Sequence, residues 1–200
     1  MTTLLIQTEQ TPLMVNLPEM ALMTHEQFTQ FCLANRDLRI ERNANGEVII
    51  MAPTFADTGN RNFNIAVQLG IWSEENGTGI GFDSSTGFTL PNGATRSPDV
   101  SWIRLERWDR LTAAQQASFS SVCPDFVIEL RSASDTLVGL QAKMVEYLEN
   151  GAVLGWLIDR KNRSLHIYRP NREPEILVNP ETVSGDPELS GFVMKMTKIW

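Results

Sequence analysis

Residues 126–158 read FVIELRSASDTLVGLQAKMVEYLENGAVLGWLI, and this stretch decides the fold class. It opens with an almost wholly apolar run, 126–130, of the kind that forms a strand buried on both faces. A polar loop then leads into a helix that runs to about residue 149, and Gly151 stands where a glycine often ends a helix. A second apolar run, 154–158, follows. The order strand, helix, strand predicts a βαβ unit.

Shorter patterns on both sides extend this unit into a mixed β-sheet core flanked by helices, an α/β (α+β) fold class. Residues 1–18 are expected to form a loosely ordered lead-in, and residues 19–200 a single domain. Helices are expected over about 25–35 and 58–76, and further strands at 38–42, 47–51, 79–83, 87–90, 100–103, 165–168 and 176–178. Two apolar sets at helical spacing predict the second helix: Phe63, Val67, Gly70 and Ile71, and Ile65, Leu69 and Trp72.

The composition is that of an ordinary globular protein. The 200 residues suit one domain and suffice to bury a full core. No apolar run approaches the roughly 20 residues that cross a bilayer, and residues 1–12 lack the basic start and apolar stretch of a signal peptide. The chain is therefore expected to be cytoplasmic, with Cys32 and Cys123 as reduced core residues rather than a disulfide.

The formal net charge of −7 argues against a non-specific coat for nucleic acid, but the charge is unevenly spread. Residues 1–130 carry the whole excess, with eight basic and fifteen acidic residues, whereas residues 131–200 carry nine of each. Within the second part, residues 131–172 hold seven basic residues against four acids. A phosphate-binding surface is expected in that segment, unless these charges simply form a solvated face.

Two acids and a cation lie at the ends of predicted strands. Asp99 opens one apolar strand, and Glu129 interrupts another. Because alternate residues of a strand point to the same side, Glu129 and Arg131 share a face, while Leu130 points into the opposite layer. An acid in so apolar a run is costly unless it is paired or binds a metal. If the two strands are neighbours, Asp99, Glu129 and the carbonyl oxygen of Leu130 could coordinate Mg²⁺ beside a phosphodiester.

A second cation, Lys143, flanks the core stripe of the helix that follows. Its stem could cover apolar surface and carry the ammonium toward the strand ends, or it could be a boundary lysine without a role in the site. Arginine stays protonated in proteins, so Arg131 cannot be a general base, but it can hold a phosphate oxygen. Lys143 would then supply what a neutral or mobile lysine supplies. These residues predict in-line attack by a metal-activated water, with both cations neutralising the phosphate.

Six segments carry a resemblance to a known family: Arg39-Ile40-Glu41 with Gly46-Glu47-Val48, Met51-Ala52-Pro53, Ser97-Pro98-Asp99-Val100, Val127-Ile128-Glu129-Leu130-Arg131-Ser132, Lys143 with Tyr147, and Gly155-Trp156-Leu157-Ile158-Asp159. In this order they resemble the Uma-type restriction endonucleases of the PD-(D/E)XK nuclease superfamily, over about residues 20–199. The resemblance implies a restriction-endonuclease-like core and a Mg²⁺-dependent endonuclease acting on DNA, with Mn²⁺ as a possible substitute.

The resemblance also implies roles for particular residues. Asp99 and Glu129 would be metal ligands, and Glu41 becomes a candidate third acid, or else a hairpin residue paired to a nearby arginine. The chain departs from the family pattern in two places. Arg131 stands where such a site usually has lysine, and Asn60 or Asn62 stands where the family often has histidine. Because many nucleases of this kind act as dimers, a homodimer is a further implied possibility.

Two other classes of function stay open. One is a catalytically inactive module that binds nucleic acid or protein, which Arg131 and the acidic balance favour. The other is a structural or interaction protein in which residues 152–158 and the C-terminal segment form a homodimer surface. Other chemistries are poorly supported, because His25 and His166 lie away from any cysteine- or serine-centred signature, and no P-loop or dinucleotide fingerprint occurs.

Overall fold

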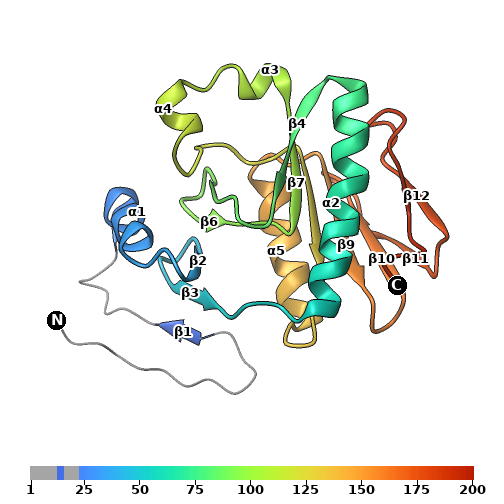
Figure 1. The fold of residues 1–200 in the computed structure, drawn as a ribbon, viewed down its shortest axis with the longest axis horizontal. Coiled ribbons are helices and arrows are strands. Elements are labelled where there is room, and N and C mark those ends of the chain that lie inside the picture. Colours follow the sequence, from blue (N-terminus) through green and yellow to red (C-terminus); the bar gives the residue numbers. More distant parts are fainter. Residues whose placement is uncertain (1–12, 16–22) are drawn as a thin grey trace.

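The computed structural model describes the fold of residues 13–15 and 23–200 (Figure 1). Of the predicted lead-in, residues 1–12 and 16–18 lie outside the described residues, and Leu13–Val15 form a short strand. The helices are α1 (His25–Ala34), α2 (Ala56–Asn76), α3 (Leu105–Trp108), α4 (Ala113–Gln116) and α5 (Leu137–Glu149). The strands are β1 (Leu13–Val15), β2 (Arg39–Arg42), β3 (Val48–Met51), β4 (Gly79–Asp83), β5 (Phe88–Thr89), β6 (Thr95–Arg96), β7 (Val100–Arg104), β8 (Phe126–Leu130), β9 (Leu154–Asp159), β10 (Ser164–Tyr168), β11 (Glu175–Val178), β12 (Thr182–Ser184) and β13 (Val193–Lys195).

A six-stranded mixed sheet forms the centre of the molecule. Its strand order is β11-β10-β9-β8-β7-β4. Strands β8 and β9 are parallel and are joined through α5, while the other neighbours are antiparallel. The predicted βαβ unit is therefore confirmed, and so is the mixed sheet with helices on its faces.

The two faces of this sheet are covered by different elements. On one face, Ile128 and Leu130 of β8 pack with Ile65 and Leu69 of α2 and with the C-terminal segment. On the other face, Val127 packs with Met144 and Tyr147 of α5. The side chain of Glu129 points to this second face, because residues of a strand alternate. The alternation predicted for 128–130 is thus confirmed, and it turns Glu129 toward α5.

A second sheet, of order β1-β3-β2-β6-β5, lies beside the first. Strands β2 and β3 form the hairpin predicted around Asn45-Gly46, and Gly46 has the positive φ of 85° that such a turn requires. Strand β2 also pairs with β6, through Arg42 and Thr95. Because of this pairing, Glu41 in β2 lies close to residues 97–99, which connect β6 to β7.

Helix α2 is amphipathic in a way that the sequence did not show. Ile65 and Leu69 of one apolar set are fully buried, but Phe63, Val67 and Ile71 of the other set are exposed, with Phe63 at 66%. Since a helix can bury only the face it turns to the sheet, these three side chains lie on the far face.

The predicted homodimer surface at residues 152–158 is wrong. Strand β9 lies between β8 and β10 in the sheet, and Trp156 is fully buried, with its ring stacked 5.6 Å from that of Phe192. The C-terminal segment is core as well, because Met194, Met196 and Ile199 are fully buried. A strand that is paired on both edges and covered on both faces has no surface left to bind a second chain.

In the described part of the chain, no helix has the length and apolar character needed to cross a membrane.

Candidate active site

Asp99 immediately precedes β7, which lies beside β8 in the sheet. The two strands are neighbours, with Val100 opposite Ile128. The amide of Leu130 donates a hydrogen bond to Asp99 Oδ2 at 2.9 Å, and the Asp99 side chain is 13% exposed. The pairing of β7 with β8 thus brings Asp99 to the end of β8, where Glu129 lies.

Glu129 is buried against α5 and is held by two groups of that helix. The hydroxyl of Tyr147 donates to Glu129 Oε1 at 3.0 Å, and Lys143 Nζ lies 2.9 Å from the same oxygen. Lys143 and Tyr147 are four residues apart, so they share one face of the helix. Helix α5 thereby places its cation over the only acid of β8.

Lys143 also reaches Glu41, which comes from the second sheet. Its Nζ donates to Glu41 Oε1 at 2.9 Å, so one ammonium joins acids from both sheets. Glu41 is further held by the amide of Ser97 at 2.9 Å and by Arg96 at 3.2 Å. The structure thus brings Glu41, Glu129 and Lys143 together, and two cations surround the buried Glu41.

The pKa values of this cluster follow from burial and pairing. Burial raises the pKa of Glu129 to about 7, and the charges of Asp99 and Glu41 add to the rise while Lys143 opposes it. Burial is also the main reason why the pKa of Asp99 is raised. Burial alone would raise the pKa of Glu41, but Lys143 and the other groups around it hold it below its ordinary value. Burial opposes the charged form of Lys143, yet Glu129 and Glu41 raise its pKa above that of a free lysine. A neutral Lys143 therefore does not fit this environment.

Arg131 lies one residue beyond the end of β8 and makes its contacts elsewhere. Its Nη1 pairs with Asp159 Oδ2 at 3.0 Å, and its Nε donates to the carbonyl of Asp135 at 3.3 Å. Asp159 is fully buried at the end of β9 and also accepts hydrogen bonds from Asn162. The structure thus gives Arg131 a carboxylate partner of its own, outside the contacts that join Glu41, Lys143 and Glu129.

Comparison with known proteins identifies the family and the fold of the chain. Residues 25–197 match the model of the Uma2 family, described as "Putative restriction endonuclease". The chain belongs to this family. A solved structure described as a putative nuclease belonging to DUF820 from Anabaena variabilis ATCC 29413 is similar in fold, with a TM-score of 0.68 and 18% identity over 80% of this chain and 88% of that one. No curated protein matches the sequence.

Asn62, one of the two asparagines that stand where the resemblance led us to expect histidine, contacts Asp99. Asn62 is on the sheet-facing side of α2, and its Nδ2 donates to Asp99 Oδ1 at 3.2 Å. A side chain from this place in α2 therefore touches the acid at the start of β7. Asn60 instead has its carbonyl bonded to Asn64 on the helix surface.

Several residues at the site were missed by sequence reasoning. Tyr147, Asp159 and Arg39 were named only within the segments that carry the resemblance, without roles of their own, and Arg96 was not singled out. Arg39 lies with its Nη2 at 3.7 Å from Asp99 Oδ1. One signal could have found Arg39: it precedes Glu41 by two residues on the same strand, and alternate residues share a face.

The donors at the site suit a hard divalent cation. Asp99 and Glu129 supply carboxylate oxygens, and Mg²⁺ is commonly held by one or two carboxylates with water completing its shell. Within residues 23–200, no group of three or more His, Cys, Asp and Glu is placed to hold a metal ion. Water and substrate would therefore supply the remaining ligands. The carbonyl oxygen of Leu130 was the third expected ligand. The contact that the structure shows is made by the other backbone group of Leu130, the amide, which donates to Asp99 Oδ2.

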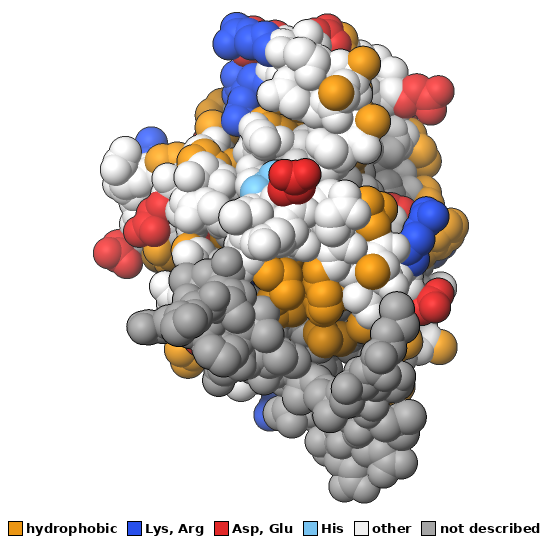
Figure 2. Space-filling model, turned by 90° about the vertical axis from the view of Figure 1, so that its left-hand side faces the viewer, with side chains coloured by type: hydrophobic (Ala, Val, Ile, Leu, Met, Phe, Trp, Pro, Cys, Tyr) orange, Lys and Arg blue, Asp and Glu red, His pale blue; other side chains and the backbone are white. Residues whose placement is uncertain are grey.

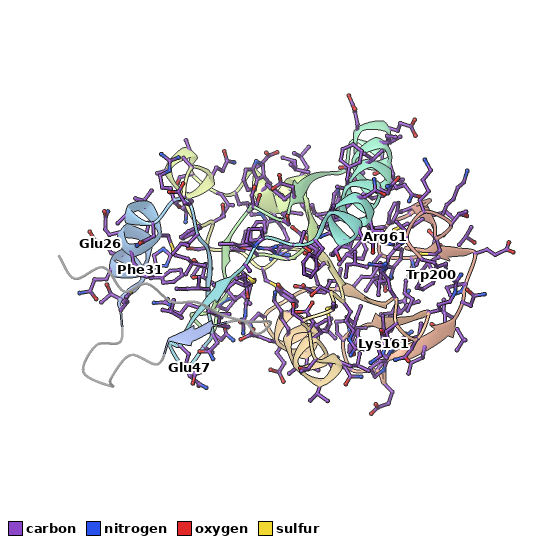
Figure 3. The ribbon with its side chains drawn as sticks, turned by 60° about the horizontal axis from the view of Figure 1, so that its bottom comes forward. Glu26, Phe31, Glu47, Arg61, Lys161 and Trp200 are labelled. Carbon is purple, nitrogen blue, oxygen red and sulfur yellow. The ribbon has the colours of Figure 1, made fainter. Side chains whose placement is uncertain are left out.

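The basic residues of 131–172 do not form one surface. Four of the seven pair with carboxylates: Arg131 with Asp159, Lys143 with Glu41 and Glu129, Arg160 with Asp57, and Arg169 with Glu188. Figure 3 shows Lys161 and Trp200 toward one side of the molecule, and Glu26 and Glu47 toward the other. Figure 2 shows the face at the left of Figure 1, and the Lys and Arg side chains visible on it lie near its margins. The expected phosphate-binding surface in this segment is therefore largely neutralised by the fold.

Proposed function

We propose that this protein is a Mg²⁺-dependent endonuclease that hydrolyses phosphodiester bonds of DNA, with Mn²⁺ able to replace Mg²⁺. The observation that carries the proposal is the meeting of Asp99, Glu129 and Lys143 where β7, β8 and α5 converge. Membership of a family described as "Putative restriction endonuclease" supports the same activity. Asp99 and Glu129 would hold the cation. When bound, it would polarise a phosphoryl oxygen and acidify the attacking water.

The chain's own residues prepare the site for this reaction. Burial of Asp99 and Glu129 removes water from two carboxylates that repel each other, and this strengthens their attraction for a cation. Lys143, protonated and fixed between Glu41 and Glu129, offsets part of that repulsion and is placed to stabilise negative charge. The Tyr147 hydroxyl and the Leu130 amide fix one oxygen of Glu129 and of Asp99 respectively. The carboxylates are thereby preorganised.

One observation favours the alternative of a catalytically inactive binding module. Lys143 lies 2.9 Å from two carboxylates, so its charge is already satisfied in the absence of substrate. In a silent module of this fold, the ion cluster would serve only to join the two sheets. The two functions differ in whether cleavage occurs at all.

The pH dependence of cleavage tests the proposal. Glu129 must be ionised to hold a cation, and its pKa is about 7. We therefore expect nicking of supercoiled plasmid in Mg²⁺ to be slow below pH 6, to rise about tenfold per pH unit there, and to level off above pH 8. Lys143 does not oppose this rise, because its raised pKa keeps it protonated. Rates that stay constant from pH 5.5 to 8.5 would show that ionisation of Glu129 does not limit the reaction.

A further inference from the structure

Several arginine and lysine side chains lie near the strand ends that carry Asp99 and Glu129, but most of them are already neutralised. Arg96 pairs with Glu146 at 2.6 Å and with Glu41 at 3.2 Å. Lys143 pairs with two acids, as described above, and Arg131 pairs with a fully buried aspartate. Each of these cations is at most 16% exposed. None of these three cations can pair with an incoming anion unless one of its existing ion pairs breaks.

Arg39 differs from these cations in contact and in exposure. Its side chain is 34% exposed, and Nη2 is 3.7 Å from Asp99 Oδ1, which is too long for a hydrogen bond. Nη2 donates instead to the carbonyl of Ser97 at 3.0 Å. Its Nε is buried and has no hydrogen-bond partner among the described residues. The guanidinium is therefore fixed by one bond while part of its donor fork is unused.

Asn62 presents a second unsatisfied group at the same carboxylate. Its Nδ2 donates to Asp99 Oδ1, but its own Oδ1 is buried and unpartnered within the described part of the chain. A buried polar atom without a partner costs about 1–3 kcal/mol, so such atoms usually meet water or a ligand. Asp99 is thus flanked by an unused donor on Arg39 and an unused acceptor on Asn62.

We propose that Arg39 is a further catalytic residue, which binds a non-bridging oxygen of the substrate phosphodiester. This inference rests on the proposed function, since it takes the substrate to be a phosphodiester held at Asp99. The planar fork of arginine suits phosphate oxygens, and Arg39 can turn its free donors to one while giving up no more than its long 3.7 Å contact with Asp99. Arg39 and Glu41 are two residues apart on β2, so their side chains share one face of the strand. The strand that holds Glu41 against Lys143 therefore also sets the position of Arg39. Asn62 Oδ1 would accept a hydrogen bond from a water of the same site.

The test compares Arg39→Gln and Arg39→Lys with Arg36→Gln, a matched control in the exposed turn just before β2. We expect Arg39→Gln to lower kcat for plasmid nicking about 10²–10³-fold, the cost of losing one donor to developing charge. Arg39→Lys keeps the charge without the fork and should lie between parent and Arg39→Gln. Arg36→Gln should cleave within about twofold of the parent, since Arg36 is exposed and makes no ion pair or side-chain hydrogen bond within the described residues.

A binding measurement separates failure of this inference from failure of the nuclease assignment. Binding of a short duplex oligonucleotide in Ca²⁺ is followed by fluorescence anisotropy at several salt concentrations. Arg39→Gln should reduce the slope of log K against log salt by about 0.9, the value for one lost phosphate contact. Cleavage by the parent with unchanged kcat and unchanged slope in Arg39→Gln would overturn the role of Arg39 and leave the nuclease intact. If the parent does not cleave, the nuclease assignment fails. A reduced slope would then still support phosphate binding by Arg39, and an unchanged slope would overturn it.

Discussion

Lys143→Met will lower the free energy of unfolding by about 3–5 kcal/mol at pH 8, because breaking a buried ion pair leaves an uncompensated charge. The variant leaves Glu41 and Glu129 buried with their shared cation removed. At pH 5 the loss will be smaller, since both carboxyls can then take up protons. Urea denaturation at the two pH values measures the effect.

Lys161→Met is the control for this change. Lys161 is exposed in the turn after β9, so the same substitution there should change stability by no more than about 0.5 kcal/mol. Equal and small losses in both variants would show that the ammonium of Lys143 does not stabilise the two acids. A large loss that is independent of pH would assign the effect to the packing of the lysine stem rather than to its charge.

Glu129→Gln will abolish cleavage and yet stabilise the protein at pH 8. We expect the cleavage rate to fall about 10³-fold, because a neutral amide cannot hold the cation or its charge. The pKa of Glu129 is about 7 in the folded protein against an ordinary value of 4.5. Stability from this raised pKa is therefore complete below pH 4.5 and is lost as the pH rises through 7. Removing the ionisable group should raise Tm by a few degrees at pH 8 and give no gain at pH 4.5.

The matched control is Glu149→Gln, at an exposed acid at the end of α5. It should leave both cleavage and Tm close to those of the parent. A Glu129→Gln variant that cleaves like the parent would remove Glu129 from the site. A variant that is inactive but destabilised at pH 8 would mean that pairing with Lys143 outweighs the cost of burying the carboxylate.

Much of the fold follows from local sequence. The apolar runs of β8 and β9 and the helix between them predicted the parallel pair, since buried strands and amphipathic helices differ in period. The Asn45-Gly46 turn predicted the β2–β3 hairpin. The sequence also singled out Asp99, which opens one apolar strand, and Glu129, which interrupts another, and the structure adds that these two strands are neighbours.

What the sequence left open depends on contacts between distant residues. Lys143 meets Glu41 across 102 positions, and Arg131 meets Asp159 across 28, so no local spacing could show either pair. The hydrophobic pattern of α2 also could not show which apolar set faces the sheet, because both sets have helical spacing. In each case the packing of whole helices and strands decides which residues meet, and the local helix or strand propensity of the sequence does not.

The most direct test of the central claim is cleavage of supercoiled plasmid by the parent protein and by Asp99→Asn, with Mg²⁺ and with chelator. Asp99→Asn keeps the size of the side chain and an oxygen that can accept the Leu130 amide, so the fold should persist. We expect the parent to nick the plasmid only in Mg²⁺ and Asp99→Asn to be inactive under both conditions. Cleavage by Asp99→Asn at the parent's rate, or by the parent in chelator, would contradict a metal-dependent site at Asp99 and Glu129.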